Sequence, residues 1–173
     1  MKRQSFENQP CTIARSVDIL GDWWTPLIIR EALYGITRFA DFEHWLGIKK
    51  NMLSSRLKQL VEQGIFRKVP YQEHPPRFEY RLTEKGFDAA QVLISMMSFG
   101  AKWMFPDQEA PILLYHRHTH QEVTPQLVDA KTGEALDVRT LYAGPGASFP
   151  QDETLRRARF RTFYREPIEE EKE

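Results

Sequence analysis

The sequence predicts an α+β fold, in which helices and a β-hairpin form the first part and a small β-rich extension follows. Three observations indicate this fold: apolar residues at helical spacing before residue 64, two β-prone runs flanking the prolines at 75–76, and helical spacing again from 84 to about 105. A chain of 173 residues can bury a real core. We expect one domain at residues 10–106 and an extension at 107–173.

The composition narrows the class of protein. The chain is 41% hydrophobic and 28% charged with zero net charge, which is ordinary for a soluble globular protein. No apolar run reaches about 18 residues and no signal-peptide pattern opens the chain, so we expect a cytoplasmic protein without a membrane partner. No Gly-rich phosphate loop, nucleophile elbow, His-Glu-x-x-His or paired-acid pattern favours an enzyme or a ligand-carrying module, and we expect no cofactor.

The first two predicted helices lie in "CTIARSVDILG" and "DWWTPLIIREALYG". The first helix stops at Gly21 and has one apolar face, made by Ile13, Val17 and Leu20. In the second helix, Thr25 and Pro26 form a suitable N-cap and first-turn pair, and Gly35 ends the helix.

A third, short helix lies in "TRFADFEHWLG". It turns Phe39, Phe42 and either Trp45 or Leu46 inward, and Gly47 closes it. Another helix begins only a few residues later. Two helices joined by a tight, Gly-containing turn predict a helix-turn-helix.

The following helix, at about residues 51–63, has two distinct faces. Its buried stripe consists of Leu53, Leu57, Leu60 and Val61. The opposite face carries Asn51, Ser55, Lys58, Gln59 and Glu62. Such polar side chains can read base edges or hold phosphates in a major groove, although an ordinary amphipathic surface helix has a similar pattern.

A β-hairpin is predicted directly after this helix. "IFRKVP" alternates as a strand, "YQEHPPR" reads as a loop and "FEYRL" as the partner strand, with the prolines at the tip because they cannot donate ladder hydrogen bonds. Residues 45–85 hold nine Lys or Arg against four Glu. A hairpin in this place is a wing, which carries cations to the phosphate backbone beside the groove, although a solvated charged face explains the charge alone.

Three stretches together resemble the HxlR-type winged helix-turn-helix transcriptional regulators, which are small bacterial and archaeal dimers of the wider MarR-like group. They are "CTIARSVDILGDWWTPLIIREAL", "RFADFEHWLGIKKNMLSSRLKQLVEQGIFRK" and "PPRFEYRLTEKG", and the resemblance covers roughly residues 10–105. It implies sequence-specific binding of double-stranded DNA by a homodimer on a pseudo-palindromic operator, most often as a repressor. We assign DNA contacts to Arg38, Lys49, Lys50, Asn51, Ser54, Ser55, Arg56, Lys58, Gln59, His74 and Arg77.

The chain departs from this family at two places. Lys49 and Lys50 stand where a capping Ser and a Pro usually begin the recognition helix, and the lost cap costs about 1 kcal/mol. Two cations at the positive end of a helix dipole add to that cost, and DNA phosphates would supply the missing anion. Cys11 is followed by Thr12 instead of the usual Pro. Relatives that sense oxidants use a cysteine here, so Cys11 is either a redox sensor or a small buried hydrophobe.

A long helix capped by Thr83 is predicted from Glu84 to about Phe105. About 20 residues give about 30 Å of helix, more than one small core can cover. We expect a second copy of the chain to cover it, although packing onto the extension is an alternative. The seam, which is also a candidate pocket for a small-molecule effector, holds Leu93, Met96, Met97, Trp103 and Met104.

The extension resembles a degenerate zinc ribbon found in some HxlR-type relatives. The positions of its thiolates hold Thr119, Asp129 and Thr132, so no structural zinc is expected. We read the extension as short strands with turns at "KTG" and "GPG". Three alternating histidines, His116, His118 and His120, would share one strand face, which is more often solvated than metal-binding. The Arg-rich "RRARFRTFYR" is an edge strand, a phosphate contact or a partner for the acidic tail.

Overall fold

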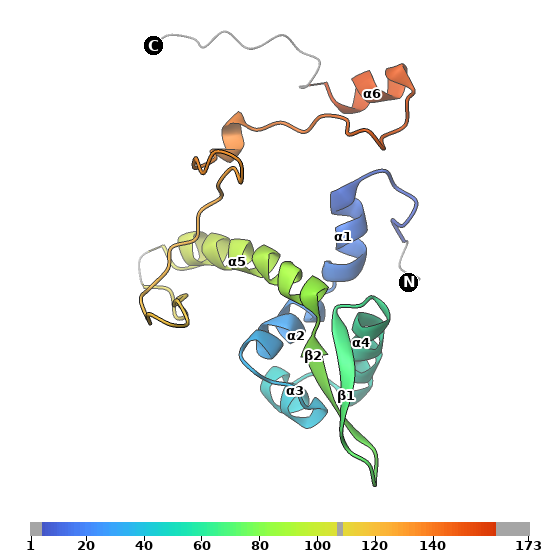
Figure 1. Cartoon of the computed structure of the whole chain (residues 1–173), viewed down its shortest axis with the longest axis vertical. Helices are drawn as coiled ribbons and strands as arrows, with labels where there is room; N and C mark the ends of the chain where they lie inside the picture. Colours follow the sequence, from blue (N-terminus) through green and yellow to red (C-terminus); the bar gives the residue numbers. More distant parts are fainter. Residues whose placement is uncertain (1–4, 107–108, 162–173) are drawn as a thin grey trace. The chain divides into compact units, whose positions relative to one another are not determined.

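The computed structural model describes residues 5–106 and 109–161, and Figure 1 shows the order of their elements. The α+β class is confirmed by a two-stranded sheet within a helical chain. The chain divides into two units between Pro125 and Gln126, later than the expected boundary at residue 107. The elements are α1 (Thr12–Leu20), α2 (Trp24–Leu33), α3 (Phe39–Leu46), α4 (Lys50–Glu62), β1 (Phe66–Gln72), β2 (Arg77–Leu82), α5 (Glu84–Met104), η1 (Val138–Thr140) and α6 (Glu153–Arg159).

The start of α2 corrects the predicted N-cap. Thr25 does not cap the helix, because α2 already begins at Trp24 and Asp22 Oδ1 accepts a hydrogen bond from the Trp24 N–H at 3.0 Å. Thr25 is instead fully buried, and its hydroxyl has no hydrogen-bond partner. A short acidic side chain two residues before Trp24 therefore satisfies the backbone, while the Thr25 side chain fills space in the core.

The turn between α3 and α4 forms the predicted helix-turn-helix. Gly47 ends α3 in the left-handed region, with a φ of 60°, and Ile48 is buried directly after it. Of the two residues proposed to face inward at the end of α3, Leu46 packs against the core and Trp45 is exposed. Glycine is the residue that adopts this backbone conformation without strain.

The core confirms the apolar stripe of α4. Leu53, Leu57 and Leu60 are buried and Val61 packs beside them. Their partners come from α2, α3, β1, α5 and the connecting segments, namely Ile28, Ile29, Phe42, Ile48, Ile65, Phe66 and Ala89. Burial of each large side chain contributes about 1.5–3 kcal/mol, so the stripe fixes α4 with its polar face outward.

The hairpin is longer than predicted. Tyr71, Gln72 and Arg77 belong to the strands, so that only residues 73–76 remain as the loop. Pro70 lies inside β1 opposite Phe78, and the register shifts directly after it. A two-stranded sheet leaves one edge of each strand unpaired, which is where a residue without an N–H is tolerated.

The base of the hairpin is joined tightly to the start of α5. The predicted cap is confirmed: the Thr83 hydroxyl accepts a hydrogen bond from the Gly86 N–H at 3.2 Å and donates to the Gly64 carbonyl at 2.6 Å. A Cβ on Gly86 would collide with the carbonyl oxygen of Ile65. The ends of α4, β2 and α5 therefore meet with no room for a side chain at Gly86.

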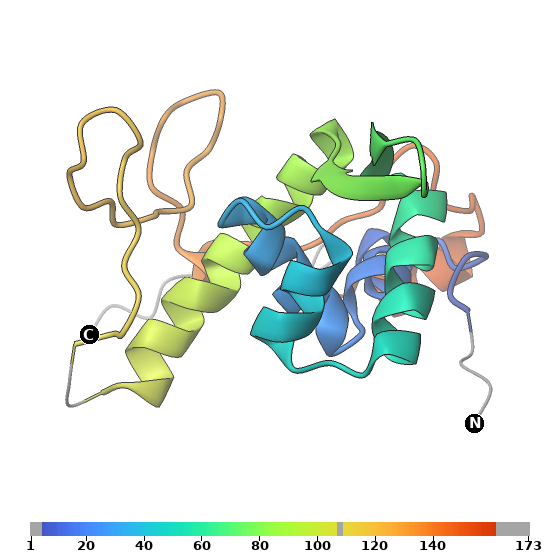
Figure 2. The ribbon, with the colours of Figure 1, turned by 90° about the horizontal axis from the view of Figure 1, so that it is seen from below.

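The long helix α5 packs on the core only with its first half. Ala89 and Ala90 are buried and Leu93 packs against the core. The second half projects past α2, as both views show (Figures 1 and 2). Phe99 and Trp103 are 62% and 58% exposed there.

The short strands predicted for the extension are not formed within residues 109–161. Two isolated β-bridges stand in their place, Tyr115 with Glu122 and Val128 with Ala135. The turn at "KTG" is present, since Gly133 has a φ of 76° and its N–H donates to the Asp129 carbonyl at 2.8 Å. Side chains here are mostly exposed, so no apolar face holds a sheet together.

The predicted strand face of three histidines is wrong. The His120 N–H donates to the His116 carbonyl at 2.8 Å, which closes a turn that also contains His118. Two positions that carry thiolates in zinc-ribbon relatives form turns as well, because side-chain oxygens of Asp129 and Thr132 accept hydrogen bonds from nearby backbone N–H groups.

The edge-strand alternative for the Arg-rich stretch, which begins at Arg156, is wrong over residues 156–159. They belong to α6, where Asp152 caps the helix by accepting a hydrogen bond from the Leu155 N–H at 2.9 Å. Glu153 and Arg157 form an ion pair one turn apart. Residues 162–173, which contain the end of this stretch and the acidic tail, lie outside the described residues.

Candidate nucleic-acid interface

The outward face of α4 presents a row of polar side chains. Because the apolar stripe is buried, helical spacing turns the remaining positions to solvent. The exposed members are Asn51, Ser54, Ser55, Lys58 and Gln59. Amide, hydroxyl and ammonium groups on one helix face are the donors and acceptors that match base edges and phosphates.

The start of α4 lacks the groups that normally satisfy a helix N-terminus. Lys49 occupies the N-cap position and makes no capping hydrogen bond, and the first turn contains no acidic residue. Lys49 and Lys50 are both exposed. Free backbone N–H groups, the positive end of the helix dipole and two ammonium groups together favour an anion at this end.

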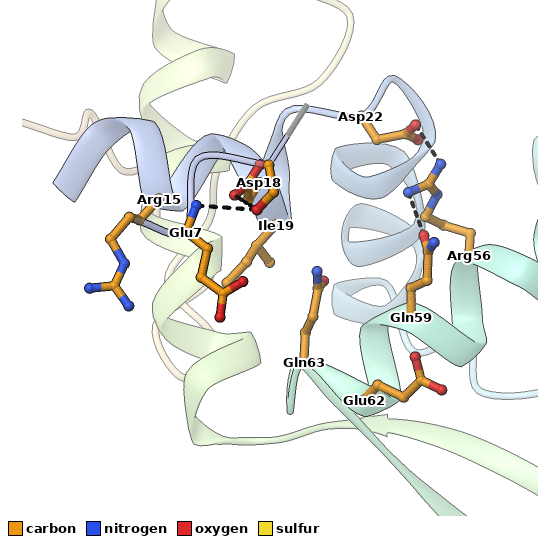
Figure 3. Close-up of a pocket in the computed structure, with 10 residues that line it drawn as sticks. Glu7, Arg15, Asp18, Ile19, Asp22, Arg56, Gln59, Glu62 and Gln63 are labelled. Atoms are coloured by element: carbon orange, nitrogen blue, oxygen red, sulfur yellow. Dashed lines mark hydrogen bonds and ion pairs between the residues drawn. The ribbon is translucent and has the colours of Figure 1, made fainter. Parts of the chain in front are cut away.

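One predicted contact residue, Arg56, is partly buried and held by contacts within the chain, and it also binds the exposed Gln59. Arg56 Nη2 lies 2.5 Å from Asp22 Oδ2, and Arg56 Nη1 donates to Gln59 Oε1 at 2.8 Å. Figure 3 shows these three side chains pointing toward one another at the edge of a pocket. Sequence reasoning missed Asp22, because no local pattern relates it to a residue 34 positions away.

The hairpin brings further cations beside α4. His74 and Arg77 are exposed at and beside its tip. Lys68 stacks over the Phe78 ring at 4.5 Å, and Arg81 forms an ion pair with Glu79 at 2.8 Å. The charge of Arg81 is thus compensated by Glu79 within the hairpin, whereas Arg77 is exposed beside the tip.

Arg38 binds the hairpin to the start of α3. Its guanidinium lies over the Tyr71 ring at 4.7 Å and 3.8 Å from a carboxylate oxygen of Glu79. The neighbouring backbone adds a hydrogen bond, from the Tyr80 N–H to the Thr37 carbonyl at 2.7 Å. Partial burial also raises the pKa of Tyr80 above its ordinary value, because burial disfavours the charged phenolate.

The residues proposed for the dimer seam separate into two groups. Leu93 packs against the core and Met97 is half-buried, whereas the exposed members are Met96, Trp103 and Met104. Met97 and Ala101 also line a pocket of about 370 Å³ together with Leu114 and Val123. Cys11 is half-buried at the N-cap of α1.

The described ranges also bear on metal binding and on membrane insertion. Residues 5–106 and 109–161 contain no group of three His, Cys, Asp or Glu side chains placed to hold a metal ion. In the same ranges, no helix has the length and apolar character needed to cross a membrane.

Comparisons with known proteins agree with this geometry. The sequence profile of the HxlR-like helix-turn-helix family matches residues 19–108. The uncharacterized HTH-type transcriptional regulator Rv3095 of Mycobacterium tuberculosis is 38% identical over 144 residues, which cover 83% of this chain and 90% of that protein.

Solved structures give the same result. The crystal structure of PA1607, described as a candidate transcription factor, has a TM-score of 0.74 and 34% identity over 83% of this chain and all of that chain. The structure of PA1374 from Pseudomonas aeruginosa has a TM-score of 0.61 and 33% sequence identity, over 86% of this chain and 99% of that chain. The redox regulator HypR in its reduced form has a TM-score of 0.51 and 25% sequence identity, over 57% of this chain and all of that chain. The polar face of α4, the basic hairpin and these matches show that the chain belongs to the HxlR-like helix-turn-helix family.

Proposed function

We propose that the chain is a sequence-specific, DNA-binding transcriptional regulator that acts in the cytoplasm as a homodimer and represses nearby genes. The observation that supports this most directly is the exposed polar face of α4. Its uncapped start carries the exposed Lys49 and Lys50, and Arg77 lies on the hairpin beside it. In this arrangement α4 enters a major groove and reads base edges with Asn51, Ser54, Ser55 and Lys58. Lys49, Lys50, His74 and Arg77 contact phosphates.

A second copy of the chain is the proposed cover for α5. Its projecting half exposes four large apolar side chains, which is costly in water: Met96, Phe99, Trp103 and Met104. Two-fold symmetry would place two copies of α4 about one DNA turn apart, so the operator is expected to be a pseudo-palindrome. A dimer seated on a promoter blocks polymerase access, which makes repression the proposed sign of regulation.

The function is tested by footprinting on the DNA upstream of the protein's own gene, followed by affinity measurements at several salt concentrations. We expect a protected pseudo-palindrome and an affinity for it about 10³-fold or more above that for random DNA. Both affinities should fall as salt rises, because bound phosphates release counterions. Absence of salt-dependent binding to any duplex would overturn the proposal, and turnover of a metabolite would favour an enzyme instead.

We further propose that a small apolar effector regulates DNA binding from the pocket beside α5. The pocket of about 370 Å³ falls within the range of ligand sites, and most of its lining is apolar, including Met97, Ala101, Leu114 and Val123. A panel of small aromatic compounds should contain one that lowers operator affinity. Val123→Asp should remove that response without changing operator affinity in the absence of the compound, and a response unaffected by Val123→Asp would place the effector elsewhere.

Redox control through Cys11 is a second proposed form of regulation. Cys11 is the only thiol of the chain and lies at the start of α1, and the similar protein HypR is a redox regulator. Any disulfide must join two chains, so the oxidised form would run as a covalent dimer on a non-reducing gel. Operator affinity should fall on diamide treatment of the wild type but not of Cys11→Ser. An equal response of both proteins, or of neither, would reduce Cys11 to a packing role.

A further inference from the structure

A pocket of about 910 Å³ separates the N-terminal segment and α1 from α4, and one ion pair crosses it at its edge. Asp22 lies between α1 and α2, and Arg56 lies in the middle of α4. The Asp22 and Arg56 side chains are only 22% and 23% exposed. An ion pair that is three-quarters shielded from water is stronger than one at the open surface, so the contact holds Arg56 in place.

Each carboxylate oxygen of Asp22 has a separate partner. Oδ1 accepts the Trp24 N–H at the start of α2, and Oδ2 accepts Arg56 Nη2. The charge of Arg56 is therefore compensated within the chain, in contrast to the exposed ammonium groups of Lys49 and Lys50 at the start of the same helix. A guanidinium that already binds a carboxylate releases few counterions when DNA arrives.

Arg56 in turn fixes the orientation of Gln59. A guanidinium has only donors, so the Gln59 oxygen must face Arg56 Nη1, as the 2.8 Å contact shows. The amide nitrogen of Gln59 then points away from Arg56 with its two hydrogens. Gln59 is exposed, so this nitrogen is presented outward from α4 as a donor.

We propose that Asp22 is a positioning residue for the recognition helix, because it keeps Arg56 from DNA phosphates and, through Arg56, sets the Gln59 amide as a pure donor toward bases. This inference rests on the proposed DNA binding by α4. A donor-only Gln59 selects base edges that accept, such as guanine O6 and N7 or thymine O4, and does not make the bidentate adenine contact that needs both amide atoms. Arg56 thus contributes to specificity without contributing to the electrostatic part of the affinity.

The test measures operator and random-DNA affinity against salt for the wild type and four variants. Arg56→Met removes the cation, and Asp22→Ser removes the carboxylate but keeps a side-chain oxygen that can cap α2. The double variant tests whether the two residues act as one unit. Lys50→Met is the matched control, since it removes an exposed cation from the same helix.

The variants should differ in how steeply their DNA affinity falls with salt. Lys50→Met should make the slope of log affinity against log salt shallower by about 0.9, whereas Arg56→Met should leave it unchanged. Asp22→Ser frees Arg56 for phosphates and should steepen the slope by up to about 0.9. Both Arg56→Met and Asp22→Ser should reduce the ratio of operator to random affinity about fivefold, the lower end for one base contact. The double variant should lose no more than either single variant.

Failure of the inference differs from failure of the proposed function. If the wild type binds DNA and Lys50→Met behaves as expected, but Arg56→Met also lowers the slope by about 0.9, then Arg56 contacts phosphate and the inference is wrong. If the wild type binds no duplex, the proposed function itself fails. Should Asp22→Ser unfold in thermal melts, the slope of Arg56→Met still decides the question.

Discussion

The helices α4 and α5 lie in one unit and are both amphipathic, but they expose opposite chemistry. In α4 the buried side is leucine and the exposed side is polar, whereas α5 buries small residues such as Ala89 and Ala90 and exposes Phe99 and Trp103. A polar exposed face is stable in water and free to exchange its hydration for DNA. An apolar exposed face is not, and it requires a partner. This difference is why we propose that the exposed face of α4 reads DNA and that the exposed face of α5 forms the dimer.

The largest effect should distinguish the two faces of α4 itself. Leu57→Ala is expected to lower the free energy of unfolding by about 3 kcal/mol, because a fully buried side chain leaves a cavity in the core. Ser55→Ala, on the exposed face two residues earlier, should change it by less than about 0.5 kcal/mol. Urea unfolding measures both. Equal losses would show that the exposed face of α4 is packed against something.

The next prediction tests whether α5 needs a second copy. Met97→Glu is expected to raise the dimer dissociation constant about 100-fold, because it places an uncompensated charge in the seam. Gln91→Glu, at an exposed position of the same helix, is the matched control and should leave assembly intact. Sedimentation at micromolar concentration reports both variants. A monomeric wild type in that experiment would remove the dimer from the proposal.

A smaller effect is expected from the polar face of α4. Asn51→Ala and Ser55→Ala should each reduce discrimination between operator and mutated operator by about 1–3 kcal/mol where the side chain makes a bidentate or equivalent base contact. Affinity for random DNA and the unfolding free energy should hardly change. Variants with full discrimination would show that a different surface reads the sequence.

The smallest effect concerns the hairpin. Arg77→Met should weaken binding to operator and random DNA alike and lower the salt slope by about 0.9, since Arg77 is exposed beside the tip. Arg81→Met is the matched control on the same strand, where Glu79 already compensates the charge. Salt titrations of DNA binding compare the two. An effect of Arg77→Met on one operator alone would mean base reading by the hairpin.

Much of the first unit could be predicted from sequence because its signals are local. The leucine stripe of α4, the closing Gly47 and the Thr83 cap each depend on residues within a few positions, and the structure confirms all three. The alternating runs on either side of the prolines at 75–76 also placed the hairpin directly after α4. These features follow from helical periodicity and capping, which are properties of short segments.

The features that sequence did not predict depend on residues far apart in the chain or on weak local signals. The ion pair of Asp22 and Arg56 joins residues 34 positions apart, and the burial of Thr25 follows from packing that no local pattern reports. The extension lacks a strong apolar period, so its alternating runs did not become strands. Tertiary contact, rather than local preference, decided each of these cases.

The joint at Gly86 has a consequence for how a signal could travel. The Thr83 hydroxyl ties the start of α5 to the end of α4, and Lys85 adds a hydrogen bond from its ammonium to the Gln63 carbonyl at 2.8 Å. With no space at Gly86 for a side chain, the start of α5 packs directly against the base of the hairpin. In a dimer whose two chains cross through α5, a change of a few degrees in the crossing angle would move both hairpins and both copies of α4 together. The spacing between the two half-sites that the dimer can bind would then depend on how the two α5 helices pack.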